Sequence, residues 1–347
     1  MDEIIYSLLI TFPTLVLVIV IAAMLFLVSK GADLLVDEAV SLSIHWGVPK
    51  MVIGATIVSL GTTLPEASVS VMAAFNGNPD LALGNAIGSI IANTGLIIGI
   101  AALLGHLPVN RMVVERQGKI QLFSGILLAV VCLPFIGGGF GNISQVTGFA
   151  FIGLLILYIY YSIKWSKEGN YVDSEKEEYG LQEITTDDIL EEEKSPILLQ
   201  VVKLFIGIAV VIGSSKVLIP AVEISAERVG IPQSIIAATL IAFGTSLPEL
   251  VTAITAVRKG HGELAVGNIV GADILNVLFV VGSAAAVTAG GLNVPISFYK
   301  LQIPTMLIIL IAFRWFSRGE NEQITKKEGT FLFGIYLIYL VLNYTWV

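Results

Sequence analysis

Long apolar segments recur along the whole chain and alternate with short polar connections. A helix that crosses a membrane needs roughly 20 mostly apolar residues, and ten segments meet this requirement. They lie near residues 8–30, 48–75, 81–105, 120–138, 146–165, 197–224, 231–257, 263–288, 299–316 and 329–346. We expect the first helix to continue to about residue 43. The pattern predicts an all-α polytopic membrane protein with ten transmembrane helices.

The composition agrees with a location in lipid. Of the 347 residues, 55% are hydrophobic and 13% are charged, whereas about a quarter of the residues in soluble domains are charged. Membrane lipid is therefore an expected partner. The chain has no basic stripe, which argues against nucleic acid as a partner. The single cysteine, Cys132, cannot form an internal disulfide bond.

Lys and Arg residues gather on alternate connections between the apolar segments. Because cytoplasmic loops carry the excess of positive charge, this pattern puts the odd-to-even connections in the cytoplasm and both termini outside. The chain begins Met-Asp-Glu, without the basic region of a signal peptide, so we expect its first apolar segment to be a retained span. The chain has no regulatory loop of eukaryotic size. We therefore expect a multi-pass protein of the plasma membrane.

One acidic segment, residues 167–196, divides the chain into two five-helix halves, residues 1–166 and 197–347. The orientation above places this segment in the cytoplasm. It is interpreted either as a solvated linker or as a regulatory loop that senses a cation. The segment lacks the Asp-x-Asp-x-Asp-Gly spacing of a tight calcium-binding loop, so we do not predict an EF-hand there.

Two segments of the chain are copies of one sequence. Residues 47–66 read GVPKMVIGATIVSLGTTLPE, and residues 230–249 read GIPQSIIAATLIAFGTSLPE, shifted by 183 positions (230 minus 47). The similarity continues without a gap over residues 47–99 and 230–282. An odd number of predicted spans separates the copies, so they cross the membrane in opposite directions. We therefore expect two inverted five-helix repeats, which in transporters enclose the substrate site.

Each copy places a Pro-Glu pair inside an apolar segment. Proline has no backbone N–H and its ring clashes with the carbonyl four residues earlier. We therefore expect Pro65 and Pro248 to break their helices and to free the carbonyls of Gly61 and Gly244. Hydroxyl side chains flank both breaks: Thr62, Thr63, Thr245 and Ser246. The alternative is a plain proline kink, healed by hydrogen bonds from these hydroxyls to the backbone.

Glu66 and Glu249 lie in the middle of these apolar helices. An acidic residue at this depth costs at least about 2.5 kcal/mol, which favours a functional role. Carboxylates, hydroxyls and carbonyls form an all-oxygen set that suits calcium, sodium or a proton, and not zinc or copper. Two neighbouring negative charges favour a divalent ion. The alternative is a protonated, hydrogen-bonded pair with a structural role.

The helix that follows each Pro-Glu pair adds further polar groups. Ser89 and Asn93 lie one turn apart in the first copy, and their equivalents in the second are Ala272 and Asn276. Asp273 is an additional buried acid, which we interpret as joining or tuning the ion site, as an interhelical hydrogen-bond partner, or as a proton carrier. Small residues that allow close helix packing recur in both copies at Gly84, Gly88, Gly267 and Gly271.

The pairs GTTLPE…GNAIGSIIAN and GTSLPELVT…GNIVGADILN resemble the two α-repeats of the sodium/calcium exchanger family, within the calcium:cation antiporter superfamily. The resemblance implies a core of spans 2, 3, 7 and 8, with spans 1 and 6 sliding across it in alternating access. It also implies that sodium and calcium compete for overlapping sites.

By position, the resemblance implies calcium ligation by Glu66 and Glu249 with the backbone oxygens of Thr62 and Thr245. It implies flanking sodium sites formed by Ser59, Thr63, Ser89, Asn93, Ser246, Asn276 and the carbonyl of Ala242. Two positions depart from the family pattern: Ala272 replaces a sodium-binding serine, and Asn276 replaces an aspartate found in many members. These departures bear on the stoichiometry and on potassium dependence.

The main hypothesis is a calcium/sodium antiporter that functions as a monomer without a cofactor, with Ca²⁺ and Na⁺ as its transported partners. The alternative is a calcium/proton or sodium/proton antiporter that uses the same carboxylates. An enzyme is a poorer fit, because the chain lacks the Gly-x-Gly-Asp and Gly-x-Ser-Gly motifs of intramembrane proteases. A passive channel could use the same ligands, but inverted repeats with matched breaks favour alternating access.

Overall fold

The computed structural model describes residues 2–134, 141–168, 196–230, 244–319 and 322–345. The first half contains α1 (Asp2–Leu9), α2 (Thr14–Trp46), α3 (Lys50–Ile53), η1 (Gly54–Val58), α4 (Ser59–Thr62), α5 (Leu64–Phe75), α6 (Pro79–Ile91), η2 (Ala92–Ile97), α7 (Ile98–Leu104), β1 (Leu107–Pro108), α8 (Arg111–Val131), β2 (Gly141–Ile143) and α9 (Gln145–Glu168). The second half contains α11 (Ile197–Arg228), α14 (Leu247–Arg258), α15 (Gly262–Leu275), η5 (Asn276–Val281), α16 (Gly282–Val287), β3 (Leu292–Val294), η6 (Phe298–Gln302), α17 (Ile303–Phe316), β4 (Gln323–Ile324) and α18 (Lys326–Thr345). Elements labelled η are short π-helical segments.

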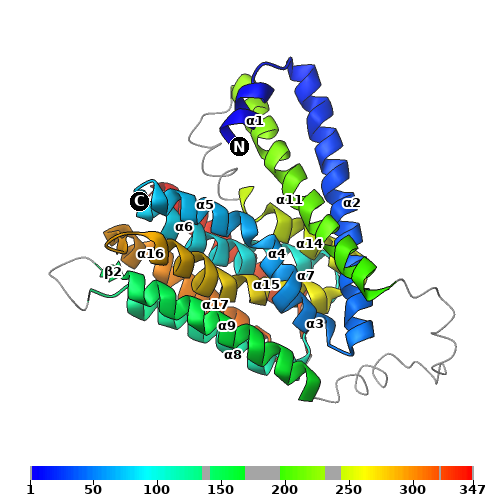
Figure 1. Cartoon of the computed structure of the whole chain (residues 1–347), viewed down its shortest axis with the longest axis vertical. Coiled ribbons are helices and arrows are strands. Elements are labelled where there is room, and N and C mark those ends of the chain that lie inside the picture. Colours follow the sequence, from blue (N-terminus) through cyan, green and yellow to red (C-terminus); the bar gives the residue numbers. More distant parts are fainter. Residues whose placement is uncertain (1, 135–140, 169–195, 231–243, 320–321, 346–347) are drawn as a thin grey trace.

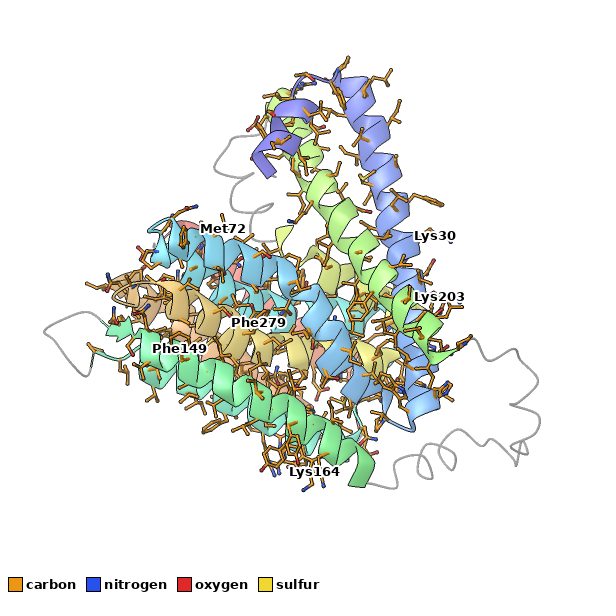
Figure 2. All side chains as sticks on the ribbon, viewed as in Figure 1. Lys30, Met72, Phe149, Lys164, Lys203 and Phe279 are labelled. Carbon is orange, nitrogen blue, oxygen red and sulfur yellow. The ribbon has the colours of Figure 1, made fainter. Side chains whose placement is uncertain are left out.

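Within the described ranges, six helices are long and apolar enough to cross a membrane, or seven if the bent pair Lys50–Thr62 and Leu64–Phe75 is one span. Large apolar side chains cover the outer surface of the bundle (Figure 2): Phe149 is 63% exposed and Met72 is 58% exposed. Such cover is unusual on a soluble protein. The fold is therefore that of a multi-pass helical membrane protein. The predicted span 231–257 lies partly outside the described residues, and the number of ten spans stays a prediction.

Helices α2 and α11 are the longest in the described chain, with 33 and 32 residues, and they pack side by side (Figure 1). A Cβ atom added to Gly31 would lie 2.9 Å from Val210, and one added to Gly207 would lie 2.8 Å from the Leu35 nitrogen. The two glycines thus allow the backbones to approach. Helix α2 ends where Gly47 adopts a left-handed conformation, with φ of 62°. The predicted continuation of the first helix to about residue 43 is confirmed.

Helix α15 lies at the centre of the bundle, and all its residues are buried. A Cβ atom on Gly267 would lie 2.1 Å from the Met51 carbonyl, and one on Gly271 would lie 2.4 Å from the Ala55 carbonyl. The α3–η1–α4 segment therefore packs directly on α15, as predicted for these two glycines. Gly84 and Gly88 differ, because a Cβ on Gly84 would make only ordinary contact, 3.5 Å from Phe298, and one on Gly88 would meet no described atom within 4 Å.

Two short antiparallel ribbons join loops between the helices. β1 pairs with β4, with Leu107 opposite Ile324, and β2 pairs with β3, with Gly141 opposite Val294. The prediction of an all-α protein omitted these strands. Strands of two or three residues are too short to produce a visible alternation of apolar and polar positions.

Candidate cation-binding site

The first Pro-Glu pair lies at a sharp break between two helices. α4 ends at Thr62, α5 begins at Leu64, and their segments bend by 43°. Pro65 lies in the first turn of α5, where its missing N–H costs no hydrogen bond. One expectation was wrong: the Gly61 carbonyl is not free, because a backbone N–H at the end of α4 bonds to it. The chain compensates for the proline by tightening this turn.

The second Pro-Glu pair repeats the same local design. Thr245 and Ser246 form a turn, and α14 begins at Leu247 with Pro248 in its first turn. Each glutamate therefore stands in the first turn of its helix, α5 or α14. The positive end of the helix dipole at this position favours a negative side chain. Ala242, whose carbonyl was a predicted sodium ligand, lies outside the described residues.

The carboxylates of Glu66 and Glu249 are fully buried and lie within electrostatic range of each other. Ser246 lies beside Glu66, and Thr62 and Thr63 lie beside Glu249, so each carboxylate faces hydroxyls of the other copy. None of these hydroxyls has hydrogen-bond geometry to a carboxylate, and all four carboxylate oxygens lack a partner in the part of the chain that the structure describes. The site thus presents four buried carboxylate oxygens that no described residue satisfies.

Two asparagines connect the copies through equivalent contacts. The Thr62 hydroxyl donates to Asn268 Oδ1 at 3.3 Å, and the Thr245 hydroxyl donates to Asn85 Oδ1 at 3.1 Å. The shift of 183 positions converts one pair into the other. Asn85 also donates to the Glu66 carbonyl at 3.2 Å. These asparagines form repeated Gly-Asn pairs in the sequence, but they were not predicted as part of the site.

A third contact is present on one side only. The Ser246 hydroxyl lies 3.4 Å from the Ser89 hydroxyl. The equivalent contact would join Thr63 to residue 272, which is alanine. The Thr63 hydroxyl is buried and has no partner among the described residues. With alanine at position 272, one hydroxyl of the site has no partner in the described part of the chain.

The remaining predicted residues are buried, but their contacts differ. The Ser59 hydroxyl donates to the Thr56 carbonyl at 3.2 Å. Both amide atoms of Asn276 lack a partner in the described chain, as does the hydroxyl of Thr252, one turn beyond Glu249. Asn93 and Asn276 lie in the π-helical segments η2 and η5, a geometry that occurs frequently at functional sites. Thr252 was not predicted.

Asp273 is held by three donors from the first half of the chain. Its Oδ1 accepts from Asn93 Nδ2 at 3.2 Å, and its Oδ2 accepts from the Thr94 hydroxyl at 2.5 Å and from Gln121 Nε2 at 2.8 Å. Both carboxylate oxygens are therefore engaged by protein groups. Thr94 and Gln121 were not predicted. Gln121 comes from α8, outside the repeated sequence, so comparison of the copies could not identify it.

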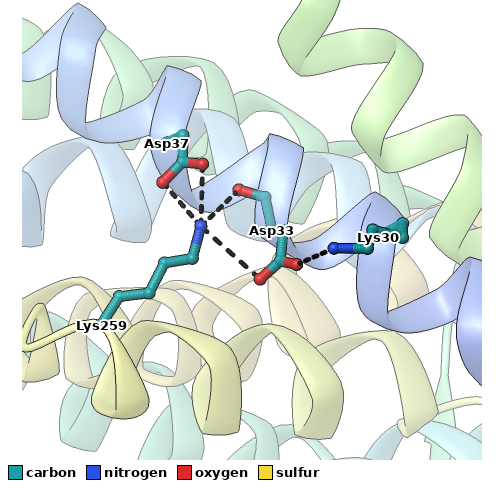
Figure 3. Close-up of polar contacts among 4 residues, drawn as sticks. All are labelled: Lys30, Asp33, Asp37 and Lys259. Carbon is teal, nitrogen blue, oxygen red and sulfur yellow. Dashed lines mark hydrogen bonds and ion pairs between the residues drawn. The ribbon is translucent and has the colours of Figure 1, made fainter.

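Ion pairs tie the helix of Glu249 to α2. Lys259, directly after α14, contacts both carboxylate oxygens of Asp37 at 2.8 Å and Asp33 Oδ1 at 3.5 Å (Figure 3). Asp33 also pairs with Lys30 at 3.4 Å. Elsewhere on α2, Glu38 pairs with Lys203 of α11 at 3.4 Å. The acidic residues of α2 are thus partners of lysines from α2 itself, α11 and the end of α14.

A large cavity of about 800 Å³ lies beside the site but does not contain it. Its wall is apolar, with Leu60, Phe205 and Phe279 among its lining residues, and no predicted ligand lines it. The buried carboxylates, and not this cavity, are therefore the candidate site.

The chain is similar to known proteins over most of its length. The family model described as "Sodium/calcium exchanger protein" matches residues 16–164 and 199–345. The inner membrane protein YrbG of Escherichia coli is 33% identical over 322 residues, covering 92% of this chain and 94% of YrbG. The sodium/calcium exchanger MaX1 of Methanosarcina acetivorans is 30% identical over 350 residues, covering 93% and 97%.

The fold is also shared with a solved structure. The sodium-calcium exchanger NCX_Mj, soaked with zero Na⁺ and Ca²⁺, superposes with a TM-score of 0.78. The match covers 95% of this chain and 99% of that one at 24% sequence identity. The chain therefore belongs to the sodium/calcium exchanger family and is a multi-pass membrane protein of the cation antiporter class.

Proposed function

We propose that this antiporter exchanges calcium for sodium across the plasma membrane by alternating access, with Glu66 and Glu249 at the centre of one cation site. The observation that carries the proposal is the pair of buried carboxylates with no hydrogen-bond partner among the described residues. Burial of an unpaired carboxylate costs several kcal/mol. A bound calcium ion would offset this cost for both glutamates, because calcium binds through carboxylate oxygens.

The relatives support calcium and sodium as the transported ions. MaX1 is named a sodium/calcium exchanger, and human sodium/potassium/calcium exchanger 2 is 28% identical over 184 residues. We propose that the backbone oxygens of Thr62 and Thr245 complete the calcium site. The flanking sodium ligands would be Ser59, Thr63, Ser89, Asn93, Ser246, Asn276 and the Ala242 carbonyl. We expect the protein to work as a monomer in lipid and without a cofactor.

Alternating access requires two related halves that can move. The reciprocal contacts Thr62–Asn268 and Thr245–Asn85 support inverted repeats, since a two-fold axis would exchange them. We propose that α2 and α11 move as a pair across the buried helices around α15. In this arrangement the chain would have ten spans, with both termini outside and the acidic segment 167–196 in the cytoplasm.

Calcium/proton exchange is a second candidate, and one observation favours it. The Thr63 hydroxyl lacks the partner that Ser89 gives to Ser246, because residue 272 is alanine. A sodium site at this position would have one hydroxyl ligand fewer. A carboxylate pair without sodium could carry protons instead.

The test is calcium uptake into proteoliposomes that contain the purified protein and are loaded with sodium. We expect uptake in sodium-loaded vesicles, none above background in potassium-loaded vesicles, and loss of uptake in Glu66→Gln. Glu322→Gln, which neutralises an exposed carboxylate, is the matched control and should transport normally. Equal uptake with both loads, or full activity of Glu66→Gln, would refute the proposal. Uptake driven by a pH gradient in sodium-free buffer would establish the second candidate instead.

A further inference from the structure

The Asp273 carboxylate fixes the orientation of a neighbouring amide. Asp273 is 1% exposed, and its carboxyl oxygens contact the side chains of Asn93, Thr94 and Gln121. Its Oδ1 accepts a hydrogen bond from Asn93 Nδ2 at 3.2 Å, whereas Oδ2 contacts Thr94 and Gln121. The amide nitrogen of Asn93 therefore faces Asp273. The amide oxygen then lies on the other side of the Asn93 side chain.

That amide oxygen is available to a cation. Asn93 Oδ1 is buried and has no hydrogen-bond partner in the described part of the chain. A buried carbonyl oxygen without a partner is energetically unfavourable, and a cation ligand is one way to offset this cost. A cation binds an amide through its oxygen and is repelled by the NH₂ group. The direction of the Asn93 amide therefore decides whether this residue can be a ligand.

Asn93 lies close to the helix that carries Glu249. It follows Ser89 by one turn, and the Ser89 hydroxyl contacts Ser246. Its segment η2 packs against α14, which carries Glu249, and Asp273 is within electrostatic range of Glu249. A cation at the glutamates would thus be bounded by the helix segment that presents Asn93.

The second copy of the repeat lacks this arrangement. The position equivalent to Asp273 is Ile90, and both amide atoms of Asn276 are without a partner among the described residues. Isoleucine offers no acceptor to an amide nitrogen. One asparagine of the pair is therefore oriented by a carboxylate, and the other has no such partner among the described residues.

We infer that Asp273 is a positioning residue that holds the Asn93 amide with its oxygen free for a transported cation. Asp273 acts through Asn93, because its own oxygens are occupied by Asn93, Thr94 and Gln121. This inference rests on the proposed cation site at Glu66 and Glu249. It does not depend on whether sodium or protons are the coupling ion.

The test is a double-mutant cycle between Asp273→Asn and Asn93→Ala, read as the calcium concentration that gives half-maximal thermal stabilisation. Asp273→Asn keeps the shape but lets the Asn93 amide turn, so this concentration should rise about tenfold, as is typical when a partner of a metal ligand is lost. In the Asn93→Ala background, Asp273→Asn should cause no further rise. Gln117→Leu, which removes a buried amide of α8 that donates to Ser162 at 3.1 Å and makes no contact with Asp273, is the control and should change the value less than threefold.

Rescue separates positioning from a structural role. Aspartate at position 93 presents an oxygen in either orientation, so Asn93→Asp should restore calcium affinity to the Asp273→Asn variant. Equal losses from Asp273→Asn with and without Asn93, or failure of this rescue, would overturn the inference. Failure of the proposed function has a different signature: wild-type protein would show no counter-transport while the calcium-binding cycle could still be measured. Absence of calcium binding by the wild type would overturn both.

Discussion

Lys259 connects the helix of Glu249 to α2, and this connection must change if the two move apart. Its ammonium group contacts Asp37 Oδ1 and Oδ2 at 2.8 Å, Asp33 Oδ1 at 3.5 Å and the Asp33 carbonyl at 3.3 Å. Under the proposed alternating access, α2 shifts relative to α14, so these contacts exist in one conformation and break in the other. We predict that Lys259→Gln shifts the balance away from the conformation described here.

The size of the shift follows from the exposure of the partners. The side chains of Lys259, Asp33 and Asp37 are 29%, 34% and 59% exposed, so solvent screens much of the attraction. An exposed ion pair contributes about 0.2–1 kcal/mol, and two such pairs sharing one lysine give roughly 1 kcal/mol. An energy of about 1 kcal/mol changes a two-state ratio about fivefold. The effect should shrink in salt, because the Debye length falls from about 10 Å at 0.1 M to about 3 Å at 1 M.

Hydrogen–deuterium exchange in detergent or nanodiscs measures this balance. In low salt, we expect peptides from the C-terminal half of α2 and from the α14–α15 connection to exchange about fivefold faster in Lys259→Gln than in wild type. The difference should disappear near 1 M potassium chloride. Lys326→Gln removes an exposed lysine from the first turn of α18 and serves as the control. Unchanged exchange at low salt, or an increase that persists in high salt, would refute an electrostatic connection between α2 and α14.

Three further predictions follow from packing, symmetry and charge. Gly271→Ala should lower the free energy of unfolding by about 1–3 kcal/mol through overpacking. Gly153→Ala should leave it unchanged, because an added Cβ there meets no described atom within 4 Å. Melting temperatures of the two variants test the difference. Ala272→Ser should lower the sodium concentration for half-maximal exchange by supplying the missing hydroxyl, and an unchanged value would argue against that sodium site. A hydrogen bond from Lys119, with nearby arginines, lowers the pKa of Glu115 from 4.5 to about 2. Its stabilisation is therefore complete above pH 4.5 and lost towards pH 2, so the melting temperature of Glu115→Gln should fall below wild type at neutral pH and converge with it in acid.

The central carboxylates could be predicted because charge stands out in an apolar sequence. Glu66 and Glu249 interrupt long hydrophobic segments, and each repeats the other's surroundings. The amide groups of the site carry no such signal: Asn85, Asn268 and Gln121 are neutral residues that occur equally well in packing roles. Their function depends on which side chains the fold brings opposite them. A one-dimensional pattern does not contain this information.

Two features of the backbone also could not be predicted from the sequence. The Gly61 carbonyl was expected to be free, but the tighter turn before Pro65 gives it a backbone partner. Proline predicts where a helix ends, while the hydrogen bonds of the ended helix depend on how the next turn closes. The π-helical segments at Asn93 and Asn276 were likewise not predicted, since one extra residue in a helical turn leaves the apolar pattern almost unchanged.

The departures from symmetry have an energetic consequence for transport. If the two halves were related by a perfect two-fold axis, the inward- and outward-facing conformations would have equal energy, and an empty site would face both sides equally. The reciprocal threonine–asparagine contacts are consistent with such a two-fold relation. The Asp273–Asn93 contact and the ion pairs of Lys259 are not, because they involve groups without an equivalent in the other half. Only groups whose contacts differ between the two conformations can shift their ratio. We therefore expect the unmatched contacts, and not the shared Pro-Glu motif, to set the resting direction of the site.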